Sequence, residues 1–183
     1  MINYLSGTYN FNGIEMPEGV DMSTDRKPSD IKEQIRTWLM EDGWSLRQET
    51  PQGGLWAFVA DDGRGRKIVV GQNINKPDEI ILQGQVNVGD DITNKISQMQ
   101  EVERNKLLWD LRFELLRTNL EFAGIEIPLK SVRVSERIFQ DELTKGHFLQ
   151  RTAEVRKGVL VVLWMLQKQF AQQPPPIQMG FQR

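Results

Sequence analysis

The sequence predicts an α+β domain built from a helix, an antiparallel three-strand meander, a long helix, two strands and a C-terminal helix. Three observations predict this order. Apolar residues recur at helical spacing between residues 30 and 42, short apolar runs separated by turn residues follow, and 28 residues without Gly or Pro begin at Ile92. Short punctuated runs are typical of antiparallel strands, and a long uninterrupted stretch favours a helix. A chain of 183 residues has the length of one domain.

The domain is expected to span residues 28–172, with its first helix over residues 30–42. Asp30 can accept hydrogen bonds from the free amides of the first helical turn, and Gly43 suits the left-handed residue that ends a helix. We expect this helix and the sheet to form a peptide-contact surface, with the candidate residues Ile31, Ile35, Trp38, Arg133 and Arg137. The two arginines could equally act, with Glu136, as charges that discourage strand addition at a sheet edge.

Four short apolar runs after the first helix indicate three or four strands. They are WSLRQE, LWAFVA, KIVVGQN and EIILQGQVNV, and turn residues separate them. Asp90 and Asp91 suit the start of the long helix, which is expected to continue to about Asn119. Two more strands, LEFAGIEI and SVRVSERI, precede a last helix over residues 143–171, in which Gly146 is a candidate break.

Two terminal segments flank the expected domain. The arm of residues 1–27 carries Asn12-Gly13 between alternating apolar residues, namely Tyr9, Phe11, Ile14 and Met16. Asn-Gly in this setting predicts a β-hairpin with a two-residue turn, whose four apolar side chains share one face and must lie on this chain or on a neighbour. The Pro-rich tail of residues 173–183 cannot continue a helix and is expected to be disordered.

The stretch KGVLVVLWMLQKQF, residues 157–170, is the most apolar part of the chain. Its uninterrupted apolar run is too short for a membrane span, which takes about 20 residues as a helix. As a helix it places a stripe against the sheet, formed by Val155, Val159, Val162, Leu163, Leu166 and Phe170. Leu160 and Trp164 then project to one side of the stripe, and Val161 and Met165 to the other. The valines leave a buried strand as the alternative.

The long helix carries apolar residues on two sides. Val102, Trp109, Phe113, Leu116 and Leu120 form one stripe, and Leu107, Leu111 and Leu115 form another. One sheet cannot bury both stripes, so the surplus predicts a homodimer. Its candidate interface, which could also take another partner, is Val102, Trp109, Phe113, Leu116, Leu160 and Trp164. The alternative is a single chain whose helices and hairpin wrap one another.

Composition limits the chemistry. The chain has no cysteine and one histidine, which excludes disulfides, thiolate nucleophiles and cysteine-based metal sites. A net charge of −2 does not suggest a nucleic-acid binder, and no cofactor or metal site is expected. The glycines of DDGRGRK precede a strand rather than a helix, so they indicate a hairpin turn and not a phosphate loop. His147 near Asp141 and Glu142 leaves a small hydrolase-like enzyme as an alternative function, against a surface histidine at a helix start.

The element order over residues 30–171 resembles the type III secretion chaperone fold, which also occurs in the YbjN-like family. The segments IKEQIRTWLMEDGW and LTKGHFLQRTAEVRKGVLVVLWML carry the likeness, and the second is similar to a helix of an uncharacterised archaeal and cyanobacterial domain family. The resemblance implies a small, often dimeric, cytoplasmic domain that binds polypeptide through apolar surface without catalysis. The N-terminus, which lacks the features of a signal peptide, agrees with a cytoplasmic location. We therefore expect a non-enzymatic, chaperone- or regulator-like protein-binding module.

Overall fold

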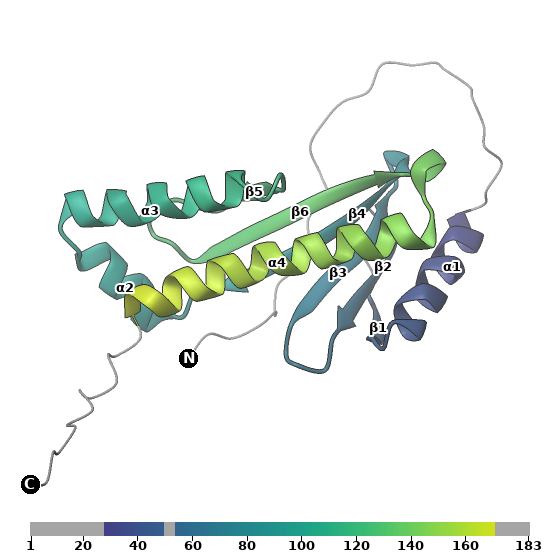
Figure 1. The fold of residues 1–183 in the computed structure, drawn as a ribbon, viewed down its shortest axis with the longest axis horizontal. Coiled ribbons are helices and arrows are strands. Elements are labelled where there is room, and N and C mark those ends of the chain that lie inside the picture. The colour runs from purple at the N-terminus through teal and green to yellow at the C-terminus, as the bar shows by residue number, and fades with distance from the viewer. Residues whose placement is uncertain (1–27, 50–53, 171–183) are drawn as a thin grey trace, which may run out of the picture.

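The computed structural model describes residues 28–49 and 54–170, which form a six-stranded antiparallel sheet with helices packed against it. The strand order is β1-β2-β3-β4-β6-β5. Figure 1 shows α1 and α4 on the same face of the sheet, with α3 beside α4. The predicted hairpin around Asn12-Gly13 and the Pro-rich tail of residues 173–183 lie outside the described residues.

The predicted α+β fold is confirmed, and its elements follow the expected order with the meander formed by four strands. The helices and strands are α1 (Pro28–Glu41), β1 (Ser45–Glu49), β2 (Gly54–Asp61), β3 (Lys67–Asn73), β4 (Lys76–Asn87), α2 (Asp90–Gln98), α3 (Glu101–Leu116), β5 (Glu121–Ala123), β6 (Ser131–Phe139) and α4 (Lys145–Phe170). A single 3₁₀ turn, η1 (Gln140–Glu142), joins β6 to α4. As expected, Gly43 ends α1 with a positive φ of 84°.

Side chains alternate between the two faces of the sheet. The face toward the helices carries the main core, which includes Phe58, Val70, Leu82 and Val134. The other face, called the open face below, carries mostly polar side chains on β1, β4 and β6, such as Arg47, Gln83 and Arg133. This alternation is normal for an antiparallel sheet that is covered on one side.

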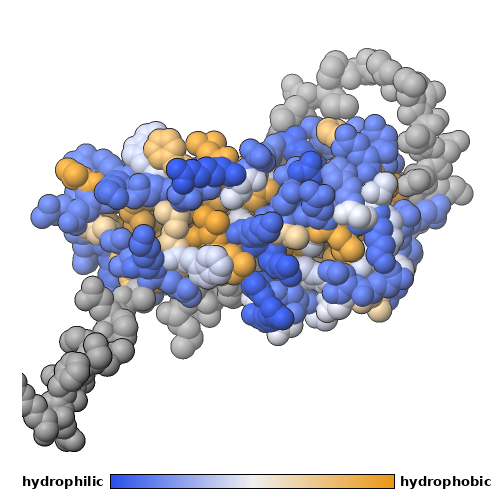
Figure 2. All heavy atoms as spheres, in the orientation of Figure 1, coloured by the Kyte–Doolittle hydropathy of each residue, from blue (hydrophilic) through white to orange (hydrophobic). Residues whose placement is uncertain are grey.

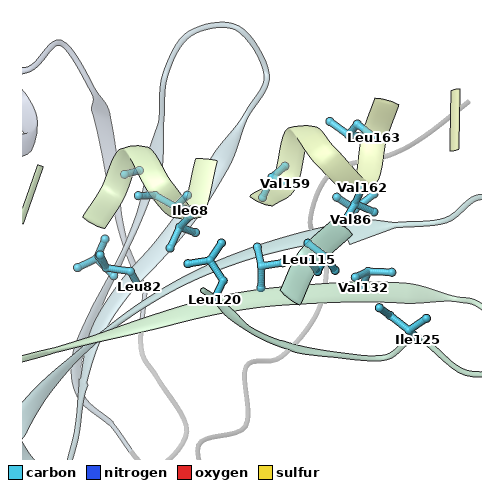
Figure 3. Packing of buried hydrophobic residues seen from close by; sticks show 14 of the residues in the cluster. Ile68, Leu82, Val86, Leu115, Leu120, Ile125, Val132, Val159, Val162 and Leu163 are labelled. Carbon is cyan, nitrogen blue, oxygen red and sulfur yellow. The ribbon is translucent and has the colours of Figure 1, made fainter. Parts of the chain in front are cut away.

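The stretch over residues 157–170 is a helix, because the whole segment Lys145–Phe170 forms α4. The predicted break at Gly146 does not occur within the helix, which begins one residue earlier. Val155 and Val159 lie beside Gly84 of β4, and Figure 3 shows Val159 and Val162 on the side of α4 toward the strands. These valines and Leu163 and Leu166 of the predicted stripe are buried. The β-branched valines favour a strand, which is the alternative for this segment. Packing against the sheet buries their side chains in a helix as well.

Two glycines set how closely α4 approaches the sheet. A Cβ atom on Gly84 of β4 would lie 2.3 Å from Val159 Cγ2, and one on Gly158 would lie 2.5 Å from Leu120 Cδ1. Real Cβ atoms do not come this close to other carbons, because carbon atoms pack at about 3.5–4.0 Å. The absence of side chains at these positions therefore allows the observed helix–sheet packing.

The predicted continuous helix from Ile92 to about Asn119 is wrong, since the structure has two helices. α2 ends at Gln98, and Met99 and Gln100 have extended backbone before α3 begins. The turn at Met99 lets both Ile96 and Leu107 join the same core.

Among the helices of the described residues, none is long and apolar enough to cross a membrane.

Candidate functional site

A groove with apolar walls lies between α3 and α4. Its volume is about 810 Å³. Figure 2 shows apolar side chains gathered in the band between these helices. The groove is lined by Lys106, Leu107, Asp110, Phe113, Glu114, Leu116, Arg117, Val161, Trp164, Met165, Lys168 and Gln169. We refer to these residues as the apolar groove.

The α3 wall of the groove continues onto an exposed aromatic ridge. The rings of Trp109 and Phe113 lie 5.8 Å apart, and each residue is 54% exposed. Arg112 holds its guanidinium 4.9 Å from the Trp109 ring centre while its Nη2 donates to the carbonyl oxygen of Ile125 at 2.6 Å. Arg112 thus connects the Trp109 ring to the backbone of the segment that follows β5.

The α4 wall of the groove contains Val161, Trp164 and Met165. The prediction that Trp164 projects to the opposite side from Val161 and Met165 is wrong, because all three line the same groove. The stripe that faces the sheet occupies the other side of the helix, so these residues form one outward face. Trp164 is 62% exposed, whereas Val161 and Met165 are half-buried against the core.

The rim of the groove is charged with both signs. Lys106 Nζ lies 2.7 Å from Asp110 Oδ2, and Arg117 Nη1 lies 2.7 Å from Glu114 Oε1. Lys168 adds a positive charge from α4. These pairs are exposed, so each contributes little to stability, and with Lys168 the rim has three positive and two negative side chains.

The structure places the six candidate interface residues as follows. Val102, Trp109, Phe113, Leu116 and Trp164 are exposed, and all but Val102 and Trp109 line the apolar groove. Leu160 is half-buried against the core and is not part of the groove lining. Leu120, expected in the same stripe, is buried beside Gly158 because the chain leaves α3 at Leu116 and turns inward. The second predicted stripe, Leu107, Leu111 and Leu115, is buried as part of the core.

The candidate peptide-contact surface is not a single surface. Ile31 and Ile35 are fully buried in the core, and Trp38 is half-buried with its ring 5.8 Å from that of Phe148. Arg133 and Arg137 lie on the open face, on the opposite side of the sheet from α1. The helical periodicity shows which side of α1 is apolar. In the structure that side packs into the core, so the periodicity did not identify an exposed peptide-contact surface.

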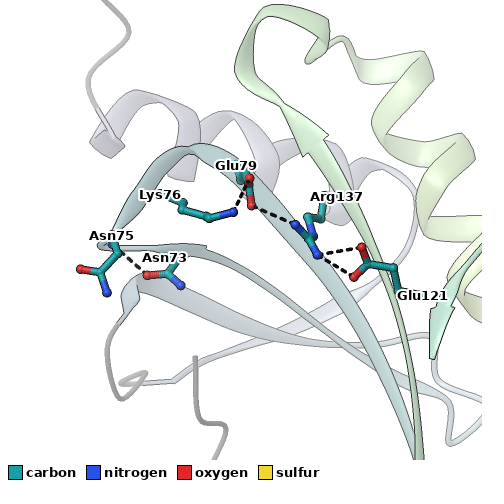
Figure 4. A network of polar contacts seen from close by, with 6 residues as sticks. All are labelled: Asn73, Asn75, Lys76, Glu79, Glu121 and Arg137. Atoms are coloured by element: carbon teal, nitrogen blue, oxygen red, sulfur yellow. Dashed lines mark hydrogen bonds and ion pairs between the residues drawn. The ribbon is translucent and has the colours of Figure 1, made fainter. Parts of the chain in front are cut away.

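Arg137 is held in an ion-pair network across the edge of the open face. Its Nη2 lies 2.7 Å from Glu121 Oε1 on β5, and its Nη1 lies 3.9 Å from Glu79 Oε2 on β4 (Figure 4). Lys76 reaches the same Glu79 at 3.1 Å. These contacts tie the short strand β5 to β6 and β4.

The hydrogen bonds of the His147 ring go to Arg151 and to the backbone of Glu142, and in the described part of the chain none goes to the carboxylates of Asp141 or Glu142. Its Nε2 accepts a hydrogen bond from Arg151 Nε at 3.0 Å, so the proton of the neutral ring sits on Nδ1, which donates to the backbone carbonyl of Glu142 at 3.1 Å. The Asp141 carboxylate instead accepts from the amide of Glu142. His147 therefore links the first turns of α4 to the backbone of the 3₁₀ turn before it.

Arg151 joins two carboxylates whose pKa values shift in opposite directions. Burial raises the pKa of Glu136, and the charges of Glu154 and Glu121 act in the same direction while Arg151 opposes them. Partial burial also acts to raise the pKa of Glu154, but hydrogen bonds from Arg151 and Gln150 outweigh it and lower that pKa. Arg151 lies 3.0 Å from Glu154 and 3.8 Å from Glu136, which explains the difference.

No group of three or more metal-ligating side chains occurs within residues 28–49 and 54–170.

The fold and the groove define a class of small α+β domains with helices on one face of an antiparallel sheet. The chain belongs to the family described as uncharacterized conserved protein (DUF2299), whose model matches residues 31–166. It is also similar to the crystal structure of an uncharacterized protein from Methanothermobacter thermautotrophicus. The two share 27% identity and a TM-score of 0.71, over 76% of this chain and 98% of that one. No curated protein matches the chain. The expected likeness to an uncharacterised family is thus confirmed, with an archaeal protein as a structural neighbour, whereas the comparisons do not support the likeness to type III secretion chaperones or YbjN-like proteins.

Proposed function

We propose that the protein is a non-enzymatic protein-binding module, chaperone- or regulator-like, that forms a homodimer through the apolar groove and the adjoining aromatic ridge. The observation that carries the proposal is the groove of about 810 Å³ next to exposed Phe113, Leu116 and Trp164. Large exposed apolar surface on a folded domain is typical of an interaction site.

A second copy of the chain suits this surface because the surface contains both a projecting ridge and a groove that could receive it. The ridge of Trp109 and Phe113 projects beside the groove, so a two-fold axis through α3 would place each ridge over the partner's groove. The rim also suits self-association, since its positive and negative side chains can pair with their own symmetry mates.

The test is the dependence of molecular mass on concentration, measured by sedimentation equilibrium. Phe113→Glu should weaken dimerisation by about 30-fold or more, because a central interface residue commonly contributes about 2 kcal/mol. Ile74→Glu is the matched control, since Ile74 is 55% exposed on the β3–β4 turn, far from the groove in sequence and outside its lining.

Two results would overturn the proposal. One is a wild-type protein that stays monomeric up to millimolar concentration, which would assign the groove to some other occupant. The other is an equal effect of Phe113→Glu and Ile74→Glu, which would remove the groove from the interface.

A further inference from the structure

The open face of the sheet carries an apolar patch at its centre. The register of β2 and β3 places Ala57 opposite Gly71 and Val59 opposite Val69, and Ile81 of β4 lies next to Gly71. We refer to these five residues as the open-face patch. Ala57, Val59 and Val69 form an apolar cluster separate from the main core, and each is at most 5% exposed. The helices α1 and α4 pack on the other face, so they do not account for this shielding.

The strands around the patch obey the opposite pattern. Arg47 and Glu49 of β1, Gln83 of β4, and Ser135 and Arg137 of β6 lie on the same face and are polar. A sheet face exposed to water normally alternates in this way, whereas a strand that is apolar on both faces is normally covered on both. The pattern on β2 and β3 therefore indicates that another segment, about two strands wide, packs on this part of the open face.

The patch is also shaped to receive side chains. A Cβ atom on Gly71 would lie 2.9 Å from the carbonyl oxygen of Trp56 and 3.3 Å from Ala57 Cβ, so the glycine leaves a shallow floor. Next to it, a hollow of about 210 Å³ opens over Val59, lined by Ser45, Leu46, Arg47, Val59, Asp61 and Lys67. Aromatic or long apolar side chains can rest on such a floor and fill such a hollow.

We propose that residues 8–16 of the same chain form a β-hairpin that docks on the open-face patch. A two-residue turn at Asn12-Gly13 pairs Phe11 with Ile14 and Tyr9 with Met16, with all four side chains on one face. These side chains make a two-by-two array, about 4.8 Å across and about 6.7 Å along the strands. The array formed by Ala57, Val59, Val69 and Gly71 has the same strand geometry.

The connection permits docking within one chain. Residues 17–27 join the hairpin to α1, and eleven residues can reach about 36 Å, several times the roughly 10 Å between stacked sheets. Charge favours the same contact, because residues 1–25 contain four carboxylates and no Lys or Arg. Arg133 is exposed on the open face, and among the described residues it has no ion-pair partner.

In this proposal the open-face patch is a second interaction surface besides the apolar groove, and residues 8–16 of the same chain occupy it. The apolar groove lies on the other face of the sheet.

Thiol labelling tests the proposal, because the chain has no cysteine of its own. Val69→Cys should react slowly with a maleimide in the full chain, and at least about ten-fold faster when residues 1–27 are deleted. Ile74→Cys, on an exposed turn, should react fast in both backgrounds, and Val70→Cys, fully buried on the helical face, should react slowly in both. In the full chain, Phe11→Ser with Ile14→Ser should reproduce the fast reaction of Val69→Cys, which keeps the test valid even where the deletion unfolds the domain.

Three outcomes would overturn the proposal. Fast labelling of Val69→Cys in the full chain would show an uncovered face. Labelling that stays slow in both the deletion and the Phe11→Ser, Ile14→Ser chain would show that the hairpin is not the cover. Protection that is lost on dilution would assign the cover to the arm of a second copy.

Discussion

Gly84→Ala should destabilise the domain, because the added methyl group has no room under α4. The new Cβ would lie 2.3 Å from Val159 Cγ2 and 3.4 Å from both Val134 Cγ2 and Val155 Cγ1. Normal carbon contacts are about 3.5–4.0 Å, so the helix or Val159 must move by more than about 1 Å. Valine has one strongly preferred rotamer in a helix, which makes rotation costly.

The expected loss in the free energy of unfolding is about 1–3 kcal/mol, the usual cost of overpacking a core. The entropy gained by removing a glycine from the unfolded chain offsets about 0.4–1 kcal/mol of that cost. Val159→Ala alone should cost about 1.5 kcal/mol for two lost methyl groups, plus a cavity contribution. In the double variant the two changes compensate, so a coupling energy of about 1–3 kcal/mol is expected.

Urea denaturation of the wild type, the two single variants and the double variant measures this coupling. Gly146→Ala is the control, because nothing lies within 4 Å of a Cβ atom at that position and the helix should gain up to about 1 kcal/mol. The reasoning is refuted by a Gly84→Ala variant as stable as the wild type. It is refuted equally by a penalty of the same size in the Val159→Ala background.

Two further predictions concern buried polar groups. Gln72→Leu should cost about 1–3 kcal/mol in urea denaturation, because the indole N–H of buried Trp56 loses the acceptor that it meets at 2.7 Å, and an unchanged midpoint would contradict this. Burial raises the pKa of Glu136 in the folded state above its value in the unfolded chain. Between these two pKa values the folded state binds more protons than the unfolded chain. The wild type therefore loses stability as the pH rises through the folded-state pKa. The unfolding free energy of Glu136→Gln relative to the wild type should therefore increase from below the ordinary glutamate pKa of about 4.3 up to neutral pH, and a difference independent of pH would contradict this.

The sequence identified elements where local chemistry dominates. Asp30 and Gly43 bound α1 within a few residues, and the turn residues after each apolar run separated the strands. The stripe of Val155, Val159 and Val162 identified the side of α4 that packs on the sheet. These features depend on interactions within a few residues or on a simple period, which one sequence contains.

Predictions from the sequence failed where the burial of a side chain depends on which distant segment packs against it. The bend between Ile96 and Leu107 has no glycine or proline to mark it, and both residues reach the core only through packing with distant segments. The two stripes of α3 look equally apolar in the sequence, yet one is buried and the other exposed. Only their position relative to α4 distinguishes them.

By itself, the sequence determined the α+β class, the order of the elements apart from the break between α2 and α3, and the presence of more apolar surface than one sheet can bury. The tertiary structure decided where that surplus lies: Trp164 joins Val161 and Met165 opposite Phe113 in the apolar groove, while Ile31 and Ile35 enter the core. The physical reason is that periodicity specifies which side of a helix is apolar. Whether that side meets a sheet, another helix or solvent depends on how distant segments pack.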